Sequence, residues 1–547
     1  MANFHARSDR QPAADRSPWV VLAVLCTSVF MLLLDTTIVN NAQRKIQIGL
    51  GADLSEIQWI LDSYILTYAV LLLSFGRLGD ILGRRRMFIA GTVLFTAASG
   101  LCGIAGPIGD AVGVSGANAL IAARVLQGVG GAMMMPQSLS IITQVFPPEK
   151  RGGALGIWGS VVGLGAITGP LLGGFIATNY DWAWVFLINV PIGIVGVFAS
   201  LRYLPESRDA DATRSIDWGG VLLSGASIFM LVYALIEVNH LGWTSPVILS
   251  LFVASAVTFA AFLWWERRQA EPMVRLELFE IRNFAVANVI LVVIAFGMFG
   301  IFFPLTIFLQ GSLGYSPFEA GLISTPLSIA MMVTAPIAGR LSDRRGPRQL
   351  VMAGMALMVL GIVALVSQVA TDTEWPRLVL PMVLCGTGMG VTMSPLTAAA
   401  MMEVPRGIAG SASGIINTTR SIGQVLGIAV LGSLLQTRMG SETETRLHHV
   451  PLDPGLHARI VDMAEASQFE QVARTMAGAP DLLPRVMGAI NSAFVESVRF
   501  TFETSAAICL LGLLVALLMR DPRRAESRAP ASESPIGSAL VAPGGGE

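Results

Sequence analysis

The sequence predicts an all-α integral membrane protein with fourteen transmembrane helices. Of its 547 residues, 53% are apolar and only 13% are charged, whereas soluble proteins carry about 25% charged residues. The mean hydropathy is +0.65, and apolar segments of the roughly 20 residues that a helix needs to cross a bilayer recur along the chain. These three observations argue against a water-soluble enzyme.

The apolar segments follow one another along most of the chain. The first begins at Trp19 and lacks a small-residue cleavage site, so we interpret it as a retained helix and not as a signal peptide. The fourteen segments lie near residues 19–40, 58–76, 87–106, 117–145, 153–177, 184–203, 217–238, 246–265, 284–310, 317–339, 350–369, 378–401, 407–435 and 500–519. Because fourteen is even, both ends of the chain are expected on the same side of the membrane.

The distribution of basic residues predicts which side that is. With both termini in the cytoplasm, the inner connections hold 25 of the 36 Lys and Arg residues and the outer connections hold nine. Basic residues accumulate in cytoplasmic loops. We therefore expect a multi-pass protein of the bacterial cytoplasmic membrane with both termini inside.

Composition and motifs also argue against several functions. The net charge of −1 gives no sign of a nucleic-acid partner. The two lysines, Lys45 and Lys150, do not follow a glycine, so the phosphate-binding loop of ATPases is missing and no use of ATP is expected. Paired catalytic acids, a nucleophile elbow and a metal-binding motif are also missing. We therefore predict neither an enzyme nor a metal site.

An internal repeat divides the chain. Residues 76–91 (GRLGDILGRRRMFIAG) and 339–354 (GRLSDRRGPRQLVMAG) are identical at eight of sixteen positions, 263 residues apart. Repeats in the same orientation indicate two bundles related by an axis along the membrane normal. The predicted parts are a cytoplasmic N-tail (1–18), a six-helix bundle (19–203), a linker with two extra central helices (204–283), a second six-helix bundle with an outer loop at 436–499 (284–519), and a disordered cytoplasmic C-tail (520–547).

Several motifs resemble one known family. They are LDTTIVN (34–40), WILDSY (59–64), GRLGDILGRRR (76–86), LIAARVLQGVGGAMMMP (120–136), GLGAITGPLLGG (163–174) and FLINVPIG (186–193). Together they resemble the major facilitator superfamily, and within it the 14-helix drug:proton antiporter branch of the EmrB/QacA type. The resemblance covers residues 19–435 and the last span.

The resemblance implies proton-coupled efflux of small amphipathic compounds, cationic or polycyclic, by alternating access of the two bundles. The cofactor expectation is none: the proton-motive force is the energy source, and we expect the protein to function as a monomer in the lipid bilayer. Two alternatives on the same fold stay open, a proton-coupled uptake symporter and a lipid-handling transporter.

Three charged residues are candidates for proton coupling. Asp35 lies inside the first span, where a carboxylate is costly and is functional by default. Arg124 lies at a similar depth in the fourth span, and a nearby guanidinium would keep a carboxylate ionised. Asp62, near the start of the second span, is the third candidate. The alternatives are a structural hydrogen bond for Asp35, a clamp on backbone carbonyls for Arg124, and simple hydration for Asp62.

The two copies of the repeat supply a predicted inner latch. Each copy combines an aspartate with arginines and turn glycines, and such an aspartate pairs with arginine or caps a helix N-terminus. The predicted latch residues are Gly76, Arg77, Asp80, Gly83, Arg84, Arg85, Arg340 and Asp343.

The remaining candidates are a small-residue helix face and a weakly indicated cavity. Gly165, Gly169 and Gly173 follow at four-residue spacing beside Pro170 and Gly174, which favours close helix packing; the resemblance also makes this run an antiporter signature. The weaker candidates for the substrate cavity are Tyr64, Gln127, Asn417 and Arg420.

Overall fold

The computed structural model describes residues 17–520, except 53, 209–215, 270–271, 449, 466–468, 477–478 and 480. In this part of the chain, fourteen helices are long and apolar enough to cross a membrane. The prediction of an all-α membrane protein with fourteen spans is thus confirmed. The predicted N-tail and C-tail lie almost entirely outside the described residues.

The helices follow the predicted order. The first half contains α1 (Pro18–Leu50), α2 (Leu54–Leu82), α3 (Arg84–Gly103), the short α4 (Ala105–Val112), α5 (Gly116–Val145), α6 (Pro148–Asn179), α7 (Trp184–Leu187) and α8 (Asn189–Tyr203). The linker contains α9 (Trp218–Leu241), α10 (Pro246–Glu266) and the single turn η1 (Leu276–Phe279). The second half contains α11 (Arg282–Ile307), η2 (Phe308–Ser312), α12 (Pro317–Arg345), α13 (Pro347–Gln368), α14 (Trp375–Met402), η3 (Arg406–Ile408), α15 (Ala409–Leu447), α16 (Pro454–Glu465), α17 (Phe469–Thr475) and α18 (Leu483–Ala516).

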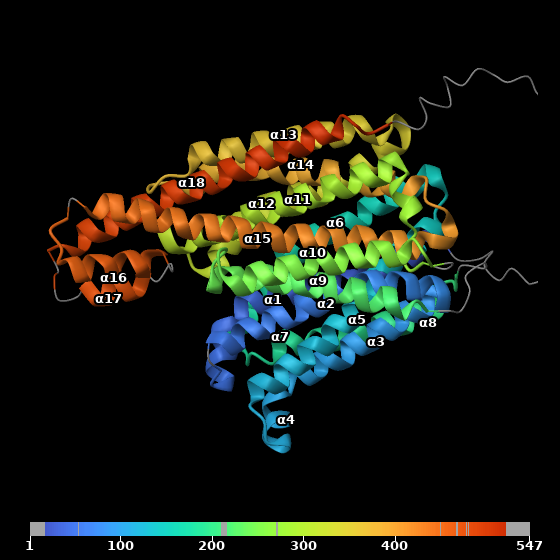
Figure 1. Cartoon of the computed structure of the whole chain (residues 1–547), viewed down its shortest axis with the longest axis horizontal. Coiled ribbons are helices and arrows are strands. Elements are labelled where there is room, and N and C mark those ends of the chain that lie inside the picture. Colours follow the sequence, from blue (N-terminus) through green and yellow to red (C-terminus); the bar gives the residue numbers. More distant parts are fainter. Residues whose placement is uncertain are drawn as a thin grey trace, which may run out of the picture.

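The helices form two bundles that lie side by side (Figure 1). In the first bundle α2 and α3 pack on α5, and α1 packs on α6; in the second, α12 and α13 pack on α14, and α11 packs on α15. We call the end that carries residues 76–86 and 339–348 the inner end, after its predicted orientation. The bundles meet mainly through α6 against α12 and α2 against α15.

The repeat in the sequence is a repeat in backbone geometry. Gly83 (φ 111°) separates α2 from α3, and Gly346 (φ 88°) separates α12 from α13. These two glycines are 263 residues apart and occupy equivalent positions of the repeat. Because side chains other than glycine rarely adopt such positive φ values, both positions require glycine to make the sharp turn between two spans.

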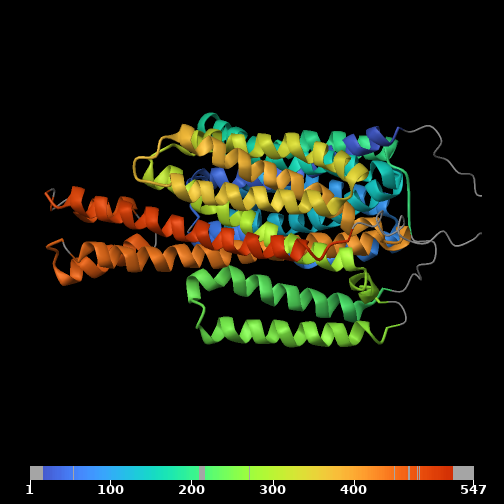
Figure 2. The ribbon, with the colours of Figure 1, turned by 90° about the horizontal axis from the view of Figure 1, so that it is seen from above.

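The two extra helices are central in the sequence but peripheral in space. Figure 2 shows α9 and α10 as a pair along one side of the molecule. They pack on each other, and α9 also packs on α2 and α15. Helix α9 therefore lies along the seam where the two bundles meet.

The structure corrects the prediction of an outer loop at 436–499, because much of this segment continues the neighbouring helices. Helix α15 runs on to Leu447 and α18 already begins at Leu483, with α16 and α17 between them. Figure 2 shows these extensions projecting beyond the other spans. Met439 and Leu447 of α15 and Val486 and Ile490 of α18 are buried. Apolar residues at helical spacing hold the extensions together, although the segment as a whole is too polar to be recognised as a membrane span.

Candidate functional site

Asp35 is the centre of a buried polar network in the first bundle. Its side chain is 0% exposed, although it lies within the first membrane span. Nη1 of Arg124 donates to Oδ2 of Asp35 at 2.6 Å, and Nε2 of Gln127 donates to Oδ1 at 2.8 Å. The structure therefore brings together the predicted residues of α1 and α5 as an ion pair with an amide beside it.

Two residues that the sequence did not single out complete this network. Nδ2 of Asn189 on α8 donates to Oδ1 of Asp35 at 2.9 Å. Ser99 on α3 accepts from Gln127 at 3.2 Å and from Asn189 at 3.1 Å. The asparagine lies in the motif FLINVPIG, so a polar amide in an apolar span was the available signal; Ser99 lies in a span with several other small hydroxyl residues and carried none.

Arg124 is held by further contacts. Its Nε donates to the carbonyl of Ile60 at 3.1 Å, and its Nη1 also donates to Oε1 of Gln127 at 2.7 Å. Its guanidinium carbon lies 4.2 Å from the centre of the Tyr64 ring. Both alternatives that the sequence left open for Arg124 are thus present, because it clamps a backbone carbonyl and also pairs with Asp35.

A row of aromatic rings leads from this network to the other bundle. The rings of Tyr64 and Tyr68 are stacked, with centres 6.0 Å apart and planes at 14°. Tyr68 shares a side-chain hydrogen bond with Arg420 of α15, and Arg420 lies 5.8 Å from the ring centre of Trp158 on α6. The predicted cavity residues Tyr64, Gln127 and Arg420 therefore belong to one continuous series of contacts.

Asn417 and Asp62 do not join that series. Asn417 is buried, and its Nδ2 donates to the carbonyl of Ser413 in its own helix at 2.9 Å. Asp62 is half-buried, and its neighbouring charge is Glu237 of α9. Asp62 thus faces the extra helices instead of the Asp35 network.

Asp80 crosses from the first bundle to the second at the inner end. Nε and Nη2 of Arg84 donate to its Oδ1 at 2.9 and 2.5 Å. The backbone N–H groups of Gly410 and Ser411 donate to its carboxylate at 2.9 and 2.8 Å. These N–H groups belong to the first turn of α15, which has no partner for them within the helix. Asp80 therefore caps a helix of the opposite bundle.

Asp343 makes the equivalent contact in the other direction. Its Oδ1 and Oδ2 accept from the N–H groups of Gly152 and Gly153 in α6, each at 2.9 Å. Arg340 lies beside the same turn, with its Cγ 3.1 Å from where a Cβ on Gly153 would be. The two copies of the repeat thus bind the two bundles to each other at the inner end.

Gly76 and Arg85, two further residues of the predicted latch, make other contacts than Asp80 and Asp343 do. A Cβ on Gly76 would lie 2.7 Å from the carbonyl oxygen of Gly410, so the glycine allows α2 and α15 to approach closely. Nη2 of Arg85 donates to the carbonyl of Leu201 within its own bundle at 2.5 Å.

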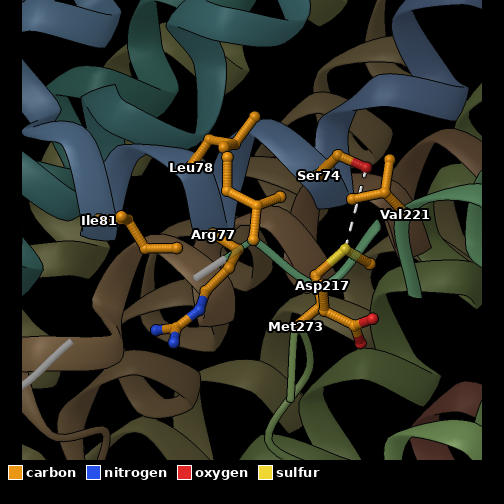
Figure 3. Close-up of a pocket in the computed structure, with 8 residues that line it drawn as sticks. Ser74, Arg77, Leu78, Ile81, Asp217, Val221 and Met273 are labelled. Atoms are coloured by element: carbon orange, nitrogen blue, oxygen red, sulfur yellow. Dashed lines mark hydrogen bonds between the residues drawn. The ribbon is translucent and has the colours of Figure 1, made fainter. Parts of the chain in front are cut away.

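Arg77 lies against the segment that carries the extra helices. Figure 3 shows it in a small pocket with Ser74, Asp217 and Met273. Asp217 caps the N-terminus of α9 and accepts from the N–H of Gly220 at 2.9 Å. This pocket therefore ties the inner end of α2 to the linker, and not to the second bundle.

The glycine face of α6 packs against α1. A Cβ on Gly165 would lie 2.7 Å from Cβ of Leu33, and one on Gly169 would overlap Thr37. Oγ1 of Thr37 donates to the carbonyl of Gly165 at 3.1 Å. Gly173 is buried in the same helix, whereas the surroundings of Pro170 and Gly174 lie outside what the structure describes. The close helix packing predicted for this run is therefore observed at Gly165 and Gly169.

The sequence predicts no metal-binding site. Among the described residues, no group of three or more His, Cys, Asp or Glu side chains is placed to hold a metal ion.

Comparison with known proteins assigns the chain to a family. The Major Facilitator Superfamily profile matches residues 23–428. The chain is 33% identical to the tetracenomycin C resistance and export protein of Streptomyces glaucescens, over 95% of this chain and 94% of that protein. It is 36% identical to the multidrug resistance protein Stp of Mycobacterium tuberculosis (strain CDC 1551 / Oshkosh), over 80% of each chain.

Solved structures show the same fold. The crystal structure of the human organic anion transporter MFSD10 (TETRAN) superposes with a TM-score of 0.57 at 14% identity, covering 91% of this chain and 99% of that one. With the two bundles, the fourteen spans and the matching family profile, the protein is a multi-pass membrane transporter and not an enzyme. It belongs to the Major Facilitator Superfamily.

Proposed function

We propose that this protein exports amphipathic polycyclic compounds across the bacterial cytoplasmic membrane in exchange for protons, as a monomer with both termini in the cytoplasm. The observation that carries the proposal is the ion pair of Asp35 and Arg124, buried inside a membrane span. A carboxylate in that position is costly to bury, and such residues mark proton or ion pathways in membrane proteins. The name of the Streptomyces glaucescens relative, a tetracenomycin C resistance and export protein, supports the direction of transport.

The proton step acts at the Asp35 carboxylate. While ionised, the carboxylate accepts from Arg124, Gln127 and Asn189. A proton arriving at Oδ1 or Oδ2 removes the negative charge that holds the guanidinium, which is then left with the carbonyl of Ile60, the Gln127 amide oxygen and the face of Tyr64 as partners. Loss of a buried charge pair changes the local energy by several kcal/mol, enough to bias a two-state equilibrium.

The two bundles supply that equilibrium. The contacts of Asp80 with α15 and of Asp343 with α6 close the inner end. In this proposal, breaking both opens a path from the cytoplasm, and the state in which both are formed is the one from which substrate leaves to the outside. Protonation of Asp35 then favours the return to the state that is open inside.

The energy of one proton per cycle is sufficient. Movement of one charge through about 100 mV yields roughly 2.3 kcal/mol, and one pH unit adds about 1.4 kcal/mol. Together these support a concentration ratio of roughly several hundred between the two sides for a neutral substrate, because each 1.4 kcal/mol corresponds to a factor of ten.

The test uses purified protein in sealed liposomes with a pH-sensitive dye inside and an imposed proton gradient. Ethidium and tetracenomycin C are added to wild type, Asp35→Asn and Asp62→Asn. We expect substrate-triggered proton movement opposite to substrate movement in wild type and in Asp62→Asn, and none in Asp35→Asn. Asp62→Asn is the matched control, because it removes a carboxylate that lies outside the network.

Other results would identify a different function. Proton and substrate movement in the same direction would indicate uptake by symport. Proton movement that persists in Asp35→Asn would remove Asp35 from the coupling path. No proton movement with either compound would contradict drug antiport and favour the lipid-handling alternative. That alternative is tested with the same liposomes and fluorescent phospholipids.

A further inference from the structure

Arg420 extends from one bundle to the other. It lies on α15, and its contacts are Tyr68 on α2 and Trp158 on α6, both in the first bundle. The ring of Trp158 is itself fixed, because the residue is buried and its Nε1 donates to Oγ of Ser138 at 3.3 Å. Arg420 therefore presents a positive charge to the interface between the bundles.

Within the described part of the chain, the charge of Arg420 is not neutralised by an acidic side chain. Among the residues that the structure describes, no acidic side chain forms an ion pair with Arg420, and its buried Nε has no hydrogen-bond partner. A guanidinium inside a membrane protein normally faces an acceptor or a water-filled path, and leaving it without a negative group costs free energy. The site is thus suited to an anionic group brought by a ligand.

The carboxylates that would attract a cation are directed elsewhere. Asp35 is fully buried, and both of its oxygens accept from groups of its own bundle. Asp62 precedes Tyr68 by six residues on α2, which places the two side chains about 120° apart around the helix and about 9 Å apart along it. Neither acid therefore lies where Arg420 does.

The surroundings of Arg420 are aromatic as well as cationic. Tyr68 is stacked on Tyr64, and the ring centre of Trp158 lies 5.8 Å from the guanidinium carbon. Aromatic rings beside a guanidinium provide a surface on which a planar ring system stacks. This combination distinguishes an aromatic acid from a simple anion.

We infer that Arg420, Tyr68 and Trp158 form a binding subsite for planar polycyclic acids, with the carboxylate or phenolate of the ligand on the Arg420 guanidinium. This inference rests on the proposed export function and names acids as a class among its polycyclic substrates. The ligand would contact both bundles at once, and it would lie two stacked tyrosines away from Arg124 and the Asp35 carboxylate.

A matched pair of ligands tests the subsite without transport. Anthraquinone-2-carboxylate and its methyl ester differ in charge and share the same ring system. Equilibrium dialysis against the purified full-length protein at neutral pH measures the affinity for each. We expect wild type to bind the acid at least about tenfold more tightly than the ester, because a charge-assisted hydrogen bond to guanidinium is among the stronger ones.

The variants locate the preference. Arg420→Gln should bind acid and ester equally, Arg420→Lys should keep part of the preference, and Tyr68→Phe should weaken binding of the acid several-fold. The control is Arg438→Gln, which removes a guanidinium from the outer part of the same helix, where it lies over Phe500 at 4.1 Å; it should keep the full preference.

Equal binding of acid and ester by wild type, or a preference that survives in Arg420→Gln, overturns the inference. If Arg420→Gln does not fold, the wild-type ratio and Arg420→Lys still decide it. Failure of the proposed function is seen separately, as a lack of coupled proton movement in wild-type liposomes, because the dialysis requires neither protons nor transport.

Discussion

Asp80 and Asp343 occupy equivalent positions of the internal repeat, and each accepts from two successive backbone N–H groups near the start of a helix in the opposite bundle. Asp80 of α2 accepts from Gly410 and Ser411 in α15, and Asp343 of α12 accepts from Gly152 and Gly153 in α6. A carboxylate at a helix N-terminus interacts favourably with the unpaired N–H groups and with the helix dipole. At the inner end the two bundles are thus joined by two related contacts instead of one.

Removing both caps should open the inner end. In Asp80→Asn with Asp343→Asn, each amide offers one acceptor oxygen without charge, so the contacts across the interface weaken by about 1 kcal/mol each, the difference between a hydrogen bond to a charged acceptor and one to a neutral acceptor. Spin labels at Arg86 and Gln349, on the inner ends of α3 and α13, should report longer distances than in the parent protein. The native cysteines are replaced for this measurement.

The double variant needs a control of the same chemistry. Asp110 is exposed on α4, away from the interface, and Asp110→Asn should leave the distance distribution unchanged. A double variant that keeps the parent distribution would show that the two caps do not hold the inner end closed.

The glycines beside the second cap should be as sensitive as the carboxylates. A Cβ on Gly152 would lie 2.4 Å from the carbonyl oxygen of Gly339, and one on Gly339 would overlap the Gly152 carbonyl. Gly152→Ala and Gly339→Ala should therefore prevent closure and lower transport at least about tenfold, since backbone atoms on both sides do not move aside. On the same helix, Gly159→Ala has its nearest neighbour at 3.9 Å and should transport normally. Dye-based efflux with matched protein amounts measures both.

The contact of α6 with α1 should govern stability. Gly169→Ala places a methyl group against Thr37, which its backbone hydrogen bond to Gly165 holds in position. Overpacking of this kind costs about 1 to 3 kcal/mol, so we expect a lower melting temperature in detergent. Gly100→Ala on α3, with its nearest neighbour at 3.8 Å, should melt like the parent. Equal melting of the two variants would contradict the close packing.

Asn189 should be needed for coupling, even though it carries no charge. Asn189→Ala removes a donor to the Asp35 carboxylate, and a hydrogen bond to a charged group contributes about 1.5 to 3 kcal/mol. Substrate-driven proton movement should fall by about tenfold or more.

The control for Asn189 is another buried intramembrane asparagine. Among the described residues, Asn288 on α11 donates to one acceptor in its own helix, the carbonyl of Phe284 at 2.8 Å, so Asn288→Ala should retain coupling. An Asn189→Ala protein with normal proton movement would restrict the coupling network to Asp35, Arg124 and Gln127.

Much of this architecture follows from sequence pattern. Length, hydropathy and the repeat of residues 76–91 at 339–354 predict fourteen spans in two bundles, because a bilayer imposes both the length and the apolar character of each crossing. The matching depths of Asp35 and Arg124 also predict their neighbourhood, since a buried charge requires a partner.

Which residues from distant parts of the chain pair with each other could not be predicted from the sequence. Nothing in the pattern distinguishes Asp35, which meets Arg124, from Asp62, which faces Glu237 on an extra helix. Depth along a helix is visible in the sequence, but direction around the bundle depends on how the helices rotate and pack. For the same reason Ser99 and Asn189 were not predicted as partners.

The sequence by itself determined the class, the number of spans, the repeat and the residue types that the inner end requires. Only the tertiary structure decided that the caps cross between the bundles, that α9 lies along their seam, and that Arg420 reaches Tyr68 and Trp158. The physical reason is that burial in a membrane constrains each helix separately, whereas contacts between helices depend on the shapes of both surfaces at once.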